Sequence, residues 1–104
     1  MDEQARNAVQ KQLEECGQKT MKSSEQLTHD LNTVKTSWRK FKAARVALDS
    51  AKVHMENIME LQNLLLEHDP VNAKANLKNI EDLKTVMKQL GKLAGKAKKE
   101  PNEQ

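Results

Sequence analysis

Apolar residues recur at steps of three and four along most of this chain, which is the spacing of one face of an α-helix. Over residues 27–65 they form a continuous stripe, and a seven-residue ladder from Leu13 to Met55 runs through part of it. Ala44 and Ala51 occupy gaps in the stripe. The stripe predicts a long helix with one buried face. Its members are Leu27, Leu31, Val34, Trp38, Phe41, Leu48, Met55, Ile58, Leu61 and Leu65.

The helix-breaking signals before residue 68 are weak. Gly17 and the segment 23–26 are the least helical part of the pattern, and Ser23 with Gln26 fits a capping box. We therefore predict a first helix over residues 3–20 and a second over 24–67. A single unbroken helix over residues 3–67 is the alternative.

The clearest boundary lies at residues 68–70. Pro70 cannot continue an existing helix but suits the first position of a new one, and Asp69 before it is a good N-cap. A third helix is expected over residues 70–90, ending where two glycines follow. Residues 96–104 are expected to form a disordered basic and polar tail.

The composition narrows the fold class. The chain has 104 residues, of which 2% are aromatic, and it contains 3 Gly and 2 Pro. An all-β fold needs frequent turn residues and β-branched or aromatic runs, and an α/β enzyme fold needs apolar strands before Gly-rich turns. Since neither pattern is present, we predict an all-α fold with a single helical domain over residues 1–95.

The predicted helix lengths constrain how this domain packs. At 1.5 Å per residue the central helix would be roughly 65 Å long and its neighbours roughly 30 Å or less. The result is an elongated helical hairpin or three-helix, coiled-coil-like arrangement with a long central helix. Each short helix would cover only half of the central one, so apolar surface would remain for self-association or for a helical partner.

Cations gather in two places, although the formal net charge is only +3. The first cluster lies between Leu31 and Leu48, a stretch without Asp or Glu that also contains both aromatic residues. Both clusters could be ordinary solvated helix faces, or they could make weak contact with nucleic acid or anionic lipid. The clusters are Lys35, Arg39, Lys40, Lys42 and Arg45, and then the row Lys84, Lys88, Lys92 and Lys96.

The residues that usually carry catalysis lack the required spacing. No two of the three histidines are four residues apart, so the zinc-protease pattern is absent, and no nucleophile elbow, P-loop or dinucleotide motif occurs. Cys16 stands beside Glu14 and Glu15, which should raise the pKa of its thiol. We expect no catalytic residue, no metal, no cofactor and no small-molecule substrate.

A compartment can also be predicted. A lone cysteine cannot form an internal disulfide, which favours a reducing environment. The opening residues 1–4 lack the apolar core of a secretory signal, and no apolar run approaches the ~20 residues of a membrane span. We expect a cytoplasmic or otherwise intracellular protein.

The stretch from Met55 to Leu90 combines a helix, a short turn, an Ala-containing restart and a Leu/Ile stripe. It resembles the coiled-coil arms of vesicle-tethering or kinetochore subunits. The resemblance implies an arm that assembles with other helices and has no catalytic activity.

The function predicted from these patterns is a non-catalytic protein–protein interaction, scaffold or assembly module. The alternatives are a basic helical binder of nucleic acid or anionic membrane, and a coiled-coil arm of the kind just described. The residues expected to contact the partner are Leu27, Leu31, Val34, Trp38, Phe41, Leu48, Met55 and Ile58.

Overall fold

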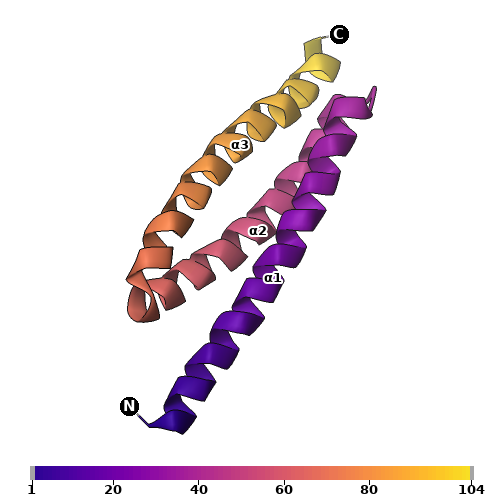
Figure 1. Cartoon of the computed structure of the whole chain (residues 1–104). Coiled ribbons are helices and arrows are strands. Elements are labelled where there is room, and N and C mark those ends of the chain that lie inside the picture. The colour runs from indigo at the N-terminus through magenta and orange to yellow at the C-terminus, as the bar shows by residue number, and fades with distance from the viewer. Residues whose placement is uncertain (1, 104) are drawn as a thin grey trace.

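The chain is described by a computed structural model that covers residues 2–103, with side chains for residues 2–95. It contains three helices in a row: α1 (Glu3–Thr36), α2 (Lys40–His68) and α3 (Pro70–Glu103). Consecutive helices run antiparallel, and the molecule is a rod of 66 × 19 × 18 Å (Figure 1). The predicted all-α class with three helices is confirmed.

The first break in the helical pattern lies elsewhere than predicted. Helix α1 continues without interruption through Gly17 and Ser23, and the chain turns at residues 37–39. The predicted helices over residues 3–20 and 24–67, and the alternative single helix over 3–67, are therefore wrong. Ser23 does not cap a helix, because its hydroxyl is buried between α1 and α2, 2.7 Å from Nδ1 of His54.

The turn at residues 37–39 contains neither Gly nor Pro and is closed by local hydrogen bonds. The backbone N–H of Ser37 donates to the Thr33 carbonyl (2.8 Å), and that of Arg39 donates to the Ser37 hydroxyl (3.1 Å). The ammonium group of Lys40 donates to the carbonyls of Val34 and Lys35, each at 3.1 Å. These last carbonyls of α1 have no partner inside the helix, so Lys40 satisfies its C-terminus.

The second boundary agrees with the prediction. Asp69 separates α2 from α3, and its carboxylate accepts a hydrogen bond from the Asn72 N–H (3.3 Å) at the start of α3. The predicted end of the third helix at residue 90 is wrong, because α3 continues through Gly91. The predicted disordered tail, residues 96–104, lies outside the residues that the structure describes in full.

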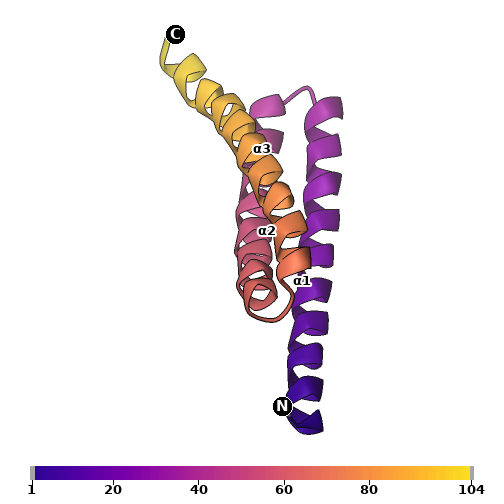
Figure 2. The same ribbon diagram turned by 60° about the vertical axis from the view of Figure 1, so that its left-hand side comes forward.

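Helix α2 is the centre of the fold. Both α1 and α3 pack along it, whereas no Cα atom of α1 comes within 8 Å of one of α3 in the described part of the chain. Ala44, Ala47 and Ala51 of α2 are completely buried, and their small side chains let two helices approach α2 closely on adjacent sides. The first turns of α1 extend past the turn between α2 and α3 (Figures 1 and 2).

The two interfaces of α2 differ in chemistry. The interface with α3 is mainly apolar, and its polar exceptions are Asn76 and Gln62, since the Asn76 amide donates to Gln62 Oε1 at 2.9 Å and both side chains are buried. The buried apolar residues of α3 are Ala73, Ile80, Leu83, Leu90 and Ala94, and most of them belong to one core cluster with Ala44, Ala51 and Ile58 of α2.

Polar side chains make up much of the interface between α1 and α2. Cys16, Ser23 and Asp30, which are seven residues apart and therefore share one helix face, are all buried. Their partners on α2 are the Asn57 carbonyl, His54 and Ser50, respectively. We call the three residues of α1 and their three partners on α2 the polar seam. No buried side-chain nitrogen or oxygen in the described residues lacks a hydrogen-bond partner, so the seam fixes the register of α1 on α2 with its polar groups satisfied.

The buried position of His54 predicts a pH dependence of stability. Burial lowers the pKa of His54 below its ordinary value of 6.5, so the folded state disfavours the imidazolium. Its contribution to stability is therefore complete above about pH 6.5 and is lost as the pH falls below that value. Urea denaturation at about pH 7.5 and pH 5.5 should show a lower free energy of unfolding at the acidic pH.

The variant His54→Gln is the matched control for this experiment. It keeps a polar side chain opposite Ser23 but cannot be protonated in this range. Its stability should change less between the two pH values than that of the natural chain. An equal acid loss in both proteins would show that other groups cause it.

Candidate binding surfaces

Among residues 2–95 no three His, Cys, Asp or Glu side chains lie close enough to hold a metal ion. The Cys16 thiol is buried, and burial followed by the charge of Glu60 raises its pKa. The predicted direction was correct, but the causes were not Glu14 and Glu15. A search of the described residues also finds no helical segment that could serve as a membrane span.

The eight predicted partner-contacting residues do not form one free stripe. Because the chain reverses at residues 37–39, the two parts of the stripe lie on different helices, and a neighbouring helix of the same copy covers much of each part. This corrects the expectation of a single uncovered face. Leu27, Val34 and Ile58 are buried, Leu31, Leu48 and Met55 are half-buried, and Trp38 and Phe41 are exposed.

A groove remains where α1 and α3 flank α2, with no Cα atoms of the described residues of the two outer helices within 8 Å of each other. Its volume is about 580 Å³. His54, Ile58 and Leu61 of α2 line it together with residues of both outer helices. The α1 wall is formed by Gly17, Thr20, Met21, Ser24, Glu25 and Leu27, and the α3 wall by Asn76, Asn79, Asp82, Leu83 and Val86.

Three properties of this groove matter for binding. Met21 is 63% exposed, so apolar surface is accessible at its rim. A Cβ atom built on Gly17 would meet nothing within 4 Å, so the α1 wall has open space in front of it. The charged residues that line the groove are Glu25 and Asp82, both acidic. Sequence reasoning missed this site because its walls belong to helices that are far apart in the chain.

A second candidate surface lies at the end of the rod that carries the turn between α1 and α2. Trp38 stands at this turn with 85% of its surface exposed, and the Arg39 guanidinium lies 4.8 Å from the centre of its ring. Phe41 is 37% exposed. The prediction that Trp38 belongs to the buried face of a helix is wrong, because Trp38 lies in the turn between α1 and α2 and its side chain is exposed.

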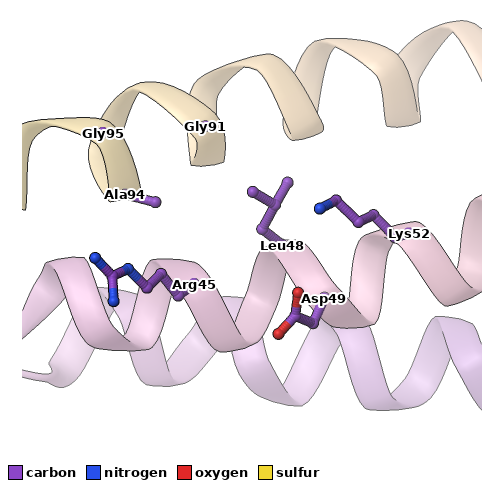
Figure 3. Close-up of a pocket in the computed structure, with 7 residues that line it drawn as sticks. All are labelled: Arg45, Leu48, Asp49, Lys52, Gly91, Ala94 and Gly95. Atoms are coloured by element: carbon purple, nitrogen blue, oxygen red, sulfur yellow. The ribbon is translucent and has the colours of Figure 1, made fainter. Parts of the chain in front are cut away.

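All five predicted cations of the first cluster are exposed at this end: Lys35, Arg39, Lys40, Lys42 and Arg45. The later turns of α3 reach the same end of the rod (Figures 1 and 2). A shallow cleft lies between the two helices there, lined on α2 by Arg45, Leu48, Asp49 and Lys52 and on α3 by Gly91, Ala94 and Gly95, with Leu48 directed toward α3 (Figure 3).

The lysine row on α3 is only partly free. Lys84 pairs with Glu81 at 3.7 Å, Lys88 and Lys92 are exposed, and the side chain of Lys96 lies outside the described residues. Asn76 pairs with Gln62, and in this antiparallel register Lys92 is level with the first turns of α2, whereas Lys84 is level with the middle of α2. We call the surface formed by residues 35–45 and 88–95 the basic end.

Comparison of the chain with known protein families, with curated proteins and with solved structures found no match.

The exposure of Trp38 predicts that it contributes little to folding. Trp38→Ala removes a side chain that has few packing partners, so we expect the free energy of unfolding to change by no more than about 0.5 kcal/mol. Urea denaturation followed by circular dichroism measures this change. A loss of about 3 kcal/mol, as for a core tryptophan, would contradict the exposed position.

The first turn of α2 predicts a substitution that raises stability. This turn contains Lys40 and Lys42 and no acidic residue. The N-cap residue is Arg39, whose side chain makes no capping hydrogen bond with the N–H groups of the turn. Because the positive end of the helix dipole lies there, Lys42→Glu should raise the free energy of unfolding by about 0.3–1 kcal/mol. Lys42→Gln should give an intermediate value in the same denaturation experiment. Lower stability of the Glu variant than of the Gln variant would contradict this account.

Proposed function

We propose that this chain is a non-catalytic helical binding module that holds an amphipathic helix of another protein in the groove between α1 and α3. The observation that carries the proposal is that both outer helices pack on α2 while their own backbones stay more than 8 Å apart between Cα atoms in the described residues. Such an arrangement leaves room for a fourth helix, which would complete a four-helix bundle.

The shape of the groove supports a helical occupant. Its floor offers the apolar side chains Ile58 and Leu61, and Leu83 and Val86 line the α3 side. The α1 wall contains Gly17 and Ser24, which are seven residues apart and therefore lie on the same helix face. Small side chains at these positions allow the backbone of an incoming helix to approach closely. An apolar stripe on the incoming helix would lie along this floor.

The charge of the groove indicates which helix would fit. Glu25 and Asp82 are the charged side chains that line it, one on each outer helix. An occupant with Lys or Arg on both edges of its apolar stripe would place these cations opposite the two carboxylates. Charge complementarity of this kind sets orientation and selects among partners more than it adds affinity.

Selection from a phage-displayed library of amphipathic helical peptides tests the proposal. The selected peptides should carry an apolar stripe edged by Lys or Arg, and should bind the monomeric chain. Met21→Glu and Gly17→Gln alter exposed or open positions on the α1 wall, so the fold should survive while peptide affinity falls about tenfold or more.

Val71→Glu is the matched control for Met21→Glu, because Val71 is 81% exposed and does not line the groove. Affinity should stay within about threefold of the natural chain in this variant. Peptides that bind Met21→Glu and Gly17→Gln as tightly as the natural chain would refute the proposal. Self-association of the chain that Met21→Glu abolishes would instead make the occupant a second copy.

A further inference from the structure

We propose that the basic end binds the surface of an anionic lipid bilayer, with Trp38 entering the interfacial region. This site is separate from the groove, and the proposal does not depend on a helical partner. It rests on three observations: the distribution of charge, the exposure of Trp38 and the unpartnered start of α2.

The charge of the rod is strongly polarised. Residues 31–48 contain five Lys or Arg and residues 84–95 contain three Lys, and neither stretch contains Asp or Glu. Acidic residues exceed cations both in residues 2–30 and in residues 49–83. The net charge is small because the cations of this end and the excess of acidic residues elsewhere on the rod nearly cancel. Close to an anionic bilayer, each Lys or Arg strengthens binding about fivefold.

The cations around the turn are available to a ligand. The ion pairs among the described residues are Lys19–Glu60, His68–Glu67 and Lys84–Glu81, and none of them involves the turn. Lys40 is bound to the carbonyls of α1 and so holds the turn itself. Lys35, Arg39, Lys42 and Arg45 remain to contact anionic groups.

Trp38 favours a bilayer over a nucleic acid as the ligand. Its ring is the most exposed large apolar side chain among the described residues and lies in the turn between α1 and α2. Tryptophan prefers the membrane interface, where its ring is partly buried while its indole N–H stays near water. Single-stranded nucleic acid is usually bound along a groove with several stacking aromatics, whereas this turn offers one fully exposed ring, Trp38.

The start of α2 adds a further reason to expect an anionic ligand. Lys42 lies in the first turn, where the helix dipole disfavours a cation, and the N-cap residue Arg39 makes no side-chain cap. The chain therefore keeps cations at a position where they reduce its stability. Anionic headgroups beside this turn would offset that unfavourable charge and accept hydrogen bonds from the free N–H groups.

Vesicle binding by the full chain tests the proposal. Vesicles of phosphatidylcholine with about 30% phosphatidylserine should bind the chain at low salt, and vesicles of phosphatidylcholine alone should bind at least tenfold more weakly. Because the chain has 1 Trp, the emission of Trp38 should shift to shorter wavelength on binding. Raising NaCl from about 0.05 to 0.3 M should reverse most of the binding.

Two variants with equal net charge locate the site. Lys42→Glu with Arg45→Glu should weaken binding at least about 100-fold, since each substitution changes the charge by two units. Lys74→Glu with Lys78→Glu makes the same change on exposed positions in the first half of α3, and its binding should stay within about threefold of the natural chain. Trp38→Ala should weaken binding about tenfold, and circular dichroism should show all variants folded.

Three results would overturn the proposal. The first is an equal loss of binding in the two double variants, which would mean that net charge alone acts. The second is binding to the anionic vesicles without any shift of Trp38 emission. The third is tight, salt-dependent binding to a short RNA or duplex DNA in the absence of vesicle binding, which would assign the basic end to nucleic acid.

Discussion

Helix α2 has to pack against two helices on adjacent sides, and the rest of the structure depends on how it does so. Three completely buried alanines, Ala44, Ala47 and Ala51, leave room for α1 and α3 to approach it closely. Larger side chains at these positions would push one of the outer helices away. Since the described residues of α1 and α3 have no Cα atoms within 8 Å of each other, each outer helix owes its position mainly to α2.

The two sides of α2 hold their neighbours by different means. Towards α3 the contact is mainly apolar, and its strength comes from removing Leu and Ile side chains from water. Towards α1 the polar seam buries less apolar surface, but its hydrogen bonds restrict how α1 can be positioned along α2. Ser23 opposite His54 and Asp30 opposite Ser50 satisfy each other only in one register, so a shift of α1 along α2 would leave buried polar groups unpaired. The groove and the basic end both inherit their shape from this register.

Both proposed surfaces consist of features that folding alone does not require. Gly17 lowers helix propensity, yet no close approach within the chain needs a glycine there. Lys42 opposes the dipole of its own helix, and Trp38 exposes a large ring to water. Residues of this kind, which weaken or do not assist the fold, are typical of positions that serve binding.

The sequence by itself determined the helical class and the boundary at Asp69-Pro70, because periodicity and proline chemistry are local properties. It also identified both cation clusters. It could not place the turn at residues 37–39, where Lys40 and Ser37 close the chain without Gly or Pro. Nor could it reveal Cys16, Ser23 and Asp30 as one buried face, since polar residues at heptad positions become core only when a neighbouring helix offers partners. The tertiary structure alone decided which apolar residues stay uncovered and brought Lys92 of the second cluster to the end that carries the first, because both depend on where antiparallel helices meet.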